Sequence, residues 1–484
     1  MNRIAKYKNI GILAIIVLIL ASCGAPDVAL REANTKVPEG FTKKAQDSIN
    51  SALIDWKEFF TDPYLNNLIE VALANNQELN ITLQELQIAK NEVRARKGEY
   101  LPFVGLQGSA ELEKSGKYTR NGAVEENLDI KEGTAMPDPL PNYMIGAYAN
   151  WELDIWGKLR SAKKAAVMRY LSTVEGRNFM ITNLIAEVSN SYYELLALDN
   201  QLEILKRNIE IQSNALRIVK LQKQSARVTE LAVQKFEAEV FKTRSIQFEI
   251  QQKVTETENK INFLLGRYPQ PIERDFEAFA NLIPDTLQAG LPSQLLQNRP
   301  DVKQAELDLA AAKLDVKVAR ARFYPSLGIS AGVGFSSFNA KYLLNTPESL
   351  LYSIAGDIAA PLINRNAIKA AYSSANSKQL QAVYNYERSI LNAYIEVSNQ
   401  LSKIDNLEKS YGLKEQEVAA LTKSIKISND LFTSARADYM EVLLTQRDAL
   451  ESKFELVETK KEQMSALVNM YQALGGGWNR QEIN

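Results

Sequence analysis

Few residue types in this chain could carry out chemistry. It has no histidine, the commonest general base and metal ligand, and one cysteine, which rules out an internal disulfide or a thiolate zinc site. The fragment Lys114-Ser115-Gly116-Lys117 lacks the upstream glycine of a phosphate-binding loop, so it indicates no nucleotide site. The carboxylates are scattered, as is usual for solvated faces. We therefore expect no enzyme, no metal ion and no soluble cofactor.

The single cysteine, Cys23, stands at the end of an N-terminal targeting pattern. Three basic residues precede the apolar run 10–20, and small residues lead up to the cysteine. Such a pattern is typical of a secretory signal peptide. It resembles the bacterial lipoprotein signal, which implies that residues 1–22 are removed and that a covalent lipid is attached to Cys23. The alternative is a plain signal peptide with a chance cysteine.

The charge balance argues against nucleic acid as a partner. Lys and Arg total 57 and Asp and Glu total 58, so no global basic field exists. Beyond residue 23 no run of apolar residues is long enough for a transmembrane helix. If the mature chain crosses a membrane, it must do so with strands.

The chain is internally duplicated. The sequence Glu-Val-Ser-Asn occurs at 187–190 and again at 396–399, and Ser-Ala-Arg recurs with the same offset at 225–227 and 434–436. Earlier in each copy, 75–93 matches 298–316 at a larger offset. The first copy therefore holds extra residues, and the polar segment 113–142 is expected to contain them as a long loop.

Long helices are predicted in both copies. Apolar or small residues recur at steps of three and four along 79–93, 184–205 and 302–323, a pattern typical of coiled-coil packing. No proline interrupts the chain from Lys158 to about Gln222, which allows a nearly continuous helix. One such stripe alone would equally fit a helical-bundle core, but several, duplicated, favour a long helical barrel or rod.

Four segments alternate apolar with small or polar residues, at about 103–112, 143–155, 326–336 and 350–362. Their length and two-faced pattern fit transmembrane strands, although a half-buried soluble sheet would alternate in the same way. The lipoprotein signal and the lack of apolar helices favour the membrane. Four strands cannot close a barrel, so this interpretation requires a homo-oligomer: a dimer with little lumen, or a trimer wide enough for a channel.

At this point the sequence resembles the TolC-like outer-membrane factors, in particular the OprM-like (NodT-like) lipoprotein branch that serves tripartite RND efflux pumps. The resemblance spans nearly the whole mature chain, on motifs that include "WELDIWGKLRSA" (151–162), "NRPDVKQAELDLAAAKLDV" (298–316) and "YQALGGGW" (471–478). It implies a mainly α chain with a transmembrane β part, long coiled-coil helices forming an α-barrel, and four strands per chain completing a 12-stranded β-barrel in a homotrimer. It also implies an outer-membrane location with extension into the periplasm, and a periplasmic adaptor and an inner-membrane RND-type pump as partners.

The resemblance places adaptor contacts at two helix-hairpin tips. The corresponding residues are Ser225, Ala226, Arg227 and Val228 in the first copy and Ser434, Ala435, Arg436 and Ala437 in the second. The family usually has glycine in the tight turn, and alanine tolerates a left-handed turn less well, which predicts a turn of different shape. The alternative is that both are merely helix–helix turns.

The resemblance also places a constriction, the periplasmic gate, at Met440, Leu444 and Arg447. Leu444 replaces the family's carboxylate; Met440 and Leu444, four residues apart, share a helix face. Three copies would form an apolar plug beside a ring of positive charge, with Asp438, Glu441 and Asp448 as candidate partners of Arg447. The alternative is coiled-coil core for Met440 and Leu444 and a solvated Arg447.

We expect residues 23–64 to form a lipidated equatorial segment, 65–270 the first repeat and 271–484 the second. The leading hypothesis is a passive exit duct for drugs or other small amphipathic compounds. Two alternatives remain: the outlet of a type I protein secretion system, and a non-conducting lipoprotein rod that spans the periplasm.

Overall fold

The computed structural model describes residues 30–41, 50–277, 279, 282, 288–361, 363–434 and 436–478. The predicted signal segment, Cys23 and Ala435 lie outside the described residues. The chain divides into two compact units, one comprising residues up to 32 with 87–171 and 307–384, the other 33–86, 172–306 and 385–484. Both repeats supply residues to both units, so the division in space cuts across the duplication in sequence.

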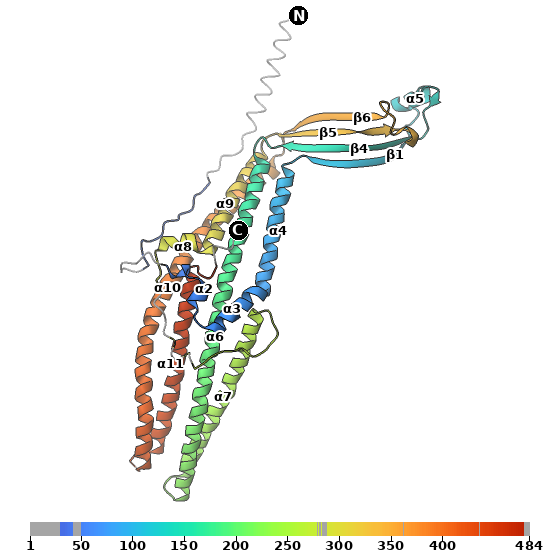
Figure 1. The fold of residues 1–484 in the computed structure, drawn as a ribbon. Helices are drawn as coiled ribbons and strands as arrows, with labels where there is room; N and C mark the ends of the chain where they lie inside the picture. Colours follow the sequence, from blue (N-terminus) through green and yellow to red (C-terminus); the bar gives the residue numbers. More distant parts are fainter. Residues whose placement is uncertain are drawn as a thin grey trace. The chain divides into compact units, whose positions relative to one another are not determined.

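The first unit is built on a four-stranded antiparallel sheet in the order β1-β4-β5-β6. Each repeat supplies two neighbouring strands, and β4 pairs with β5 across the repeats. Figure 1 shows the four strands side by side, with helix α5 at the end of the sheet where β1 passes to β4. The strands are β1 (Phe103–Glu113), β4 (Leu140–Leu153), β5 (Ser326–Ser337) and β6 (Leu350–Ala359).

The register gives the sheet one apolar face and one small or polar face. Leu106 of β1 pairs with Ala147, Ala147 with Val333, and Val333 with Tyr352 of β6, and side chains of paired residues share a face. In the single chain this face is open, since Leu106 is 87% exposed and Tyr352 is 80% exposed. The alternation read from the sequence is therefore a real two-faced sheet.

Several glycines lie on the opposite face of the sheet. Gly105 pairs with Tyr148, and a Cβ on Gly105 would stand 2.8 Å from atoms of the Tyr148 ring. Tyr148 pairs in turn with Gly332, and Gly332 with Ser353. Small residues thus leave room for the Tyr148 ring, which also contacts the Phe103 ring on this face with centroids 6.0 Å apart.

Two strands differ from their predicted ranges. The strand predicted at 143–155 begins earlier and ends at Leu153, because the Asp154 carboxylate turns to accept the N–H groups of Leu159 and Arg160, both at 2.9 Å. These are orphan donors at the start of the next helix, and a capping carboxylate satisfies them. The strand predicted at 350–362 ends at Ala359, just before Pro361, which has no N–H for the ladder.

The segment 113–142 is not the featureless loop that was predicted. It holds helix α5 (Arg120–Asn127) and a small hairpin of β2 (Asp129–Lys131) and β3 (Thr134–Ala135). The Thr119 hydroxyl accepts the N–H of Gly122 at 3.1 Å and so caps α5, and Gly133 turns the hairpin with φ 75°.

The helices account for most of the chain, which confirms the mainly α fold class. The predicted long helix from Lys158 is a single element that runs to Gln224. The short elements are η1 (Ser51–Leu53), α2 (Trp56–Phe59), α3 (Pro63–Asn75), α8 (Pro292–Asn298) and η3 (Ala340–Tyr342). The long ones are α4 (Gln77–Glu99), α6 (Lys158–Gln224), α7 (Glu230–Leu264), α9 (Pro300–Ala321), α10 (Asn366–Thr433) and α11 (Tyr439–Ala473). No helix within the described ranges is both long and apolar enough to cross a membrane.

The two helix-to-strand junctions correspond between the repeats. α4 ends at Glu99 and β1 begins directly after Pro102, while α9 ends at Ala321 and β5 begins directly after Pro325. A different tryptophan binds each junction: the Trp151 indole N–H donates to the Tyr100 carbonyl oxygen at 3.2 Å, and the Trp156 indole N–H donates to the Pro325 carbonyl oxygen at 2.7 Å. The second of these, Trp156, also makes a ring contact. Its ring stacks on Tyr324 with centroids 4.8 Å apart.

The largest core lies in the second unit. It gathers apolar residues of α3, of the middle of α6, and of the C-terminal ends of α7 and α11; Tyr192, Leu195 and Leu65 are among the fully buried ones. The Tyr192 hydroxyl donates to Asp62 at 2.7 Å, and Asp62 also accepts the Tyr64 N–H as the N-cap of α3. Burial, together with this hydrogen bond to Asp62, raises the pKa of Tyr192.

Candidate functional site

The first hairpin tip joins α6 to α7 through residues 225–229. The Ala226 N–H donates to Lys223 O and the Arg227 N–H to Gln222 O, both at 2.9 Å, which is a Schellman helix end. Ala226 holds the left-handed position with φ 56°. The expectation that alanine changes the shape of this turn is therefore wrong here: the glycine geometry is kept and strain is accepted.

An ion pair closes the same turn. Lys223, in the last turn of α6, pairs with Glu230, the first residue of α7. The hydrogen bond with Lys223 lowers the pKa of Glu230. Ser225, Ala226 and Arg227 are exposed and Val228 is half-buried. The Arg227 guanidinium has no ion-pair partner in the part of the chain that the structure describes.

The second tip lies between the end of α10 at Thr433 and the start of α11 at Tyr439, and it repeats one hydrogen bond of the first tip. The Arg436 N–H donates to Leu431 O at 2.9 Å, the counterpart of the bond made by Arg227. The hydroxyl of Ser434 donates to Asp430 O at 2.8 Å, as that of Ser225 does to Leu221 O at 3.4 Å. Arg436 is exposed and Ala437 is half-buried, so both tips present an arginine and a serine outward.

The two hairpins pack on each other near their tips. One buried cluster contains Val219, Val233 and Phe236 of the first hairpin together with Val442 and Leu443 of α11. The tips of one chain are therefore held as a pair rather than as independent arms.

The three residues of the predicted gate stand near the start of α11. Met440 is half-buried, Leu444 is 40% exposed and Arg447 is exposed. Within the chain, the face of α11 that packs into the hairpin core is the one carrying Val442, Leu443 and Gln446. Leu444 is thus not part of the hairpin core in the single chain, although its role in a gate stays a prediction.

Of the three acidic residues considered as partners for Arg447, the structure pairs it with Asp448. Nη2 of Arg447 lies 3.0 Å from Oδ1 of Asp448, and both side chains are about half exposed. Asp438 is used differently, since it is the N-cap of α11 and accepts the Met440 N–H at 3.5 Å. An exposed pair of this kind adds little stability, so Arg447 is held loosely.

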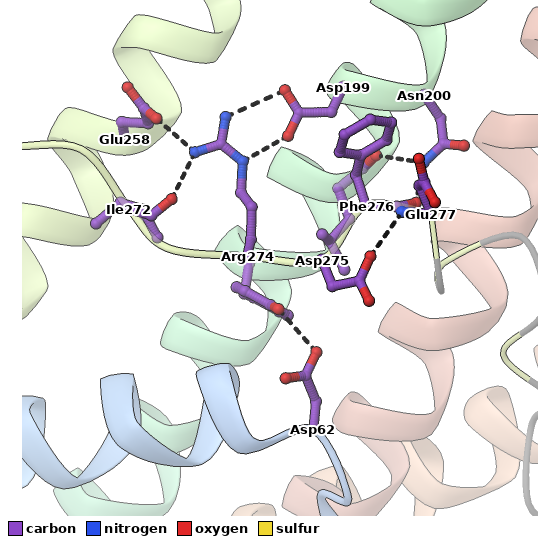
Figure 2. A network of polar contacts seen from close by, with 11 residues as sticks. Asp62, Asp199, Asn200, Glu258, Ile272, Arg274, Asp275, Phe276 and Glu277 are labelled. Carbon is purple, nitrogen blue, oxygen red and sulfur yellow. Dashed lines mark hydrogen bonds and ion pairs between the residues drawn. The ribbon is translucent and has the colours of Figure 1, made fainter.

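A partly buried ion network fixes the segment that follows α7 (Figure 2). Arg274 binds Asp199 of α6 through two nitrogens, at 2.5 and 3.1 Å, and Glu258 of α7 at 2.5 Å. Its Nη1 also donates to Ile272 O at 2.8 Å. Burial alone would lower the pKa of Arg274, but its hydrogen bonds with the two carboxylates outweigh this and raise it.

A second arginine, Arg299, is buried just before the start of α9. Arg299 binds Asp301 through two nitrogens, at 2.7 and 2.9 Å, and Glu396 of α10 at 2.6 Å. It also donates to Ala473 O, at the end of α11, at 2.8 Å. The matching position of the first repeat is Asn76, which donates to Leu264 O, at the end of α7, at 2.9 Å. The same inter-helix link is thus built twice with different side chains.

Sequence reasoning missed these two arginines as structural centres. Arg299 lies within a quoted repeat motif, and the presence of asparagine at the matching position could have drawn attention to it. Arg274 follows α7 in a segment without periodicity, and nothing in its sequence neighbourhood identifies Asp199 as its partner. Among the described residues no group of acidic or cysteine side chains could hold a metal ion.

Comparison with known proteins decides the family. The family model described as outer membrane efflux protein matches residues 68–267 and 291–476, which includes both repeats and both tips.

This chain belongs to the outer membrane efflux protein family.

Relatives of this family match almost end to end. The pyoverdine export outer membrane protein OpmQ of Pseudomonas aeruginosa is 26% identical over 98% of this chain and 98% of its own length. The cation efflux system protein CusC of Escherichia coli O6:H1 is 27% identical over 96% of this chain and 98% of its own. A crystal structure of CusC superposes with a TM-score of 0.80 at 26% identity, covering 94% of this chain and 99% of that one.

These findings confirm the predicted resemblance and the fold class. The outer membrane efflux proteins are channel proteins rather than enzymes, so the chain is an outer-membrane efflux protein without catalytic machinery. The lipid on Cys23, the tip contacts, the gate and the boundaries at residues 64 and 270 stay predictions.

Proposed function

We propose that the chain is one subunit of a homotrimeric exit duct that passively conducts small amphipathic compounds, drugs among them, across the outer membrane. The observation that carries the proposal is the register of the sheet, which gathers exposed apolar side chains such as Leu106 and Tyr352 on one face and small or polar ones on the other. An apolar outer face and a polar lumen are what a membrane-spanning sheet requires. Three copies supply the twelve strands that close such a sheet and remove its edges.

Partners follow from the same proposal. The sequence carries no phosphate-binding loop motif. In this proposal transport is driven by an inner-membrane RND-type pump, reached through a periplasmic adaptor that meets the paired tips. Met440, Leu444 and Arg447 close the periplasmic end at rest, and a lipid on Cys23 anchors the N-terminus in the outer membrane.

The substrate is set by the pump more than by this chain. OpmQ and CusC are similar to this chain at 26% and 27% identity, yet one is named for pyoverdine export and the other for cation efflux. Both names also favour efflux over the outlet of a protein secretion system. The two-faced sheet argues against a non-conducting rod, because a lipid-anchored rod does not need membrane-spanning strands.

The test uses two lysine substitutions on neighbouring residues of β1. Cells that lack the chain should accumulate a fluorescent amphipathic dye, and the wild-type gene should restore its export. Leu106→Lys, on the apolar face, should leave little assembled protein and no export, since a lysine facing lipid costs about 2–4 kcal/mol per chain. Gln107→Lys, on the opposite face, should restore export. Unchanged dye levels without the gene, or equal rescue by both variants, would contradict the proposal.

A further inference from the structure

A polar layer interrupts the apolar seam between the two hairpins. Toward the tips, the seam is the cluster that contains Val219, Phe236 and Val442. Farther from the tips, it is a second cluster that contains Leu205, Ile250 and Leu450. Between these clusters the buried residues include the polar Gln212, Thr243 and Gln446, next to the apolar Val240.

The spacing fixes where these residues point. On α6, Gln212 lies seven residues from Leu205 and seven from Val219, which places all three on one helix face. On α7, Thr243 stands in the same relation to Phe236 and Ile250.

The third helix of the seam follows the same rule. On α11, Gln446 lies one turn from Val442 and one turn from Leu450. Three helices from two hairpins thus carry a polar residue at the same level.

These residues are buried, and the two glutamines lack partners. Gln212 is 1% exposed, Thr243 is 0% and Gln446 is 1% in the single chain, and assembly can only bury them further. Neither the amide oxygen nor the nitrogen of either glutamine has a hydrogen-bond partner within the described part of the chain. Thr243 differs, because its hydroxyl donates to Glu239 O at 3.0 Å.

We propose that Gln212, Thr243 and Gln446 form a separation layer, at which the tip-side ends of the two hairpins of a chain part from each other. Buried amides without partners destabilise the packed state, and water satisfies them once the helices separate. Parting the apolar cluster beyond the layer still exposes apolar surface, which restores the closed state. The layer thereby confines opening to the tips and isolates the second cluster from it. As a device for gating, this inference rests on the proposed duct.

The test replaces the layer with apolar side chains of similar length. In the double variant Gln212→Met/Gln446→Met the two clusters become one continuous seam. Hydrogen–deuterium exchange is measured on the purified full-length protein for peptides that cover 215–236 and 439–446. We expect the tip-side amides of the double variant to exchange at least about tenfold more slowly than those of the wild type. The matched control Gln251→Met, at an exposed position of α7, should stay within about twofold of the wild type.

Exchange that is unchanged or faster in the double variant would overturn the proposal. If that variant fails to assemble, the single variant Gln446→Met is tested instead. We expect its tip-side amides to exchange about threefold more slowly than those of the wild type, and unchanged or faster exchange would overturn the proposal. The measurement does not depend on conduction. If exchange slows but the protein conducts nothing, the proposed duct is refuted and the separation layer is supported. If the protein conducts but exchange is unchanged, the duct is supported and the separation layer is refuted.

Discussion

A Cβ on Gly475 would stand 2.7 Å from the carbonyl oxygen of Asn298, and Gly475 itself has φ 84°. In the first repeat, a Cβ on Gly266 would stand 2.5 Å from the carbonyl oxygen of Asn75, with φ 66°. The C-terminal end of a long helix therefore meets the same neighbouring backbone twice, and only glycine fits at either place.

Gly475→Ala should destabilise the protein through both the positive φ and the contact with Asn298. The left-handed backbone alone costs about 1–2 kcal/mol in an alanine, and the contact adds to it. Gly412→Ala is the control, because nothing lies within 4 Å of its Cβ position and it sits inside α10. It should raise stability by about 0.5–1 kcal/mol. Denaturant unfolding of the purified variants checks both, and equal shifts would refute the steric argument.

Arg274→Ala should be among the most destabilising changes in the second unit. It leaves Asp199 and Glu258, whose side chains are 14% and 23% exposed, without their partner. Breaking a fully buried ion pair costs about 3–5 kcal/mol, and the partial exposure places this change at the lower end of that range. The stability of Arg274→Lys should lie between those of the wild type and of Arg274→Ala, because lysine keeps the positive charge but lacks the planar guanidinium that binds Asp199 at two points. Arg207→Ala removes an ion pair whose arginine is 75% exposed, and should change stability by less than about 0.5 kcal/mol. Similar midpoints for Arg274→Ala and Arg207→Ala in urea would contradict this account.

Acid should weaken the junction between β4 and α6. Burial would raise the pKa of Asp154, but hydrogen bonds from the Arg160 and Leu159 N–H groups and from the Arg160 side chain lower it overall. A carboxyl group whose pKa is lower when folded stabilises the fold above its unfolded pKa, near 3.8, and loses that contribution as the pH falls through the folded value. Asp154→Asn should be less stable than the wild type at neutral pH by about 1 kcal/mol, and the difference should shrink below pH of about 4. Thermal unfolding of both proteins at several pH values measures this stability difference. A difference that stays constant with pH would show that the charge of Asp154 is irrelevant.

The first tip should tolerate glycine better than a branched residue. Ala226→Gly relieves the left-handed strain, so amide exchange across residues 222–230 should slow or stay unchanged. Ala226→Val should speed it, because a β-branched residue is disfavoured at positive φ. Equal exchange in the two variants would indicate that the turn rearranges freely.

The sequence predicted what is periodic and repeated. Alternation located all four strands to within a few residues, and the uninterrupted stretch after Gly157 located α6, because both patterns follow directly from which face is buried. The ends of β4 and β6 were missed because they depend on single events, the capping by Asp154 and the missing N–H of Pro361. Local sequence propensity alone predicts neither of these strand ends.

The buried centres were missed for a different reason. Arg274 meets Asp199 across 75 residues of sequence, and the buried, unpartnered Gln212 and Gln446 lie on different hairpins. Such contacts depend on how helices pack, which a periodic pattern indicates only as a face. The sequence limited the candidate partners of Arg447 to a few nearby carboxylates, but it did not determine that Asp448 rather than Asp438 is the partner.

Single-channel conductance tests the central claim, a passive duct closed at its periplasmic end, most directly. Purified trimer in a planar bilayer should show discrete conductance steps, and these should rise when Met440 and Arg447 are both replaced by alanine. Lys423→Ala, which removes an exposed positive charge from α10, should leave the steps unchanged. No conductance in either the wild type or the double variant would contradict the account.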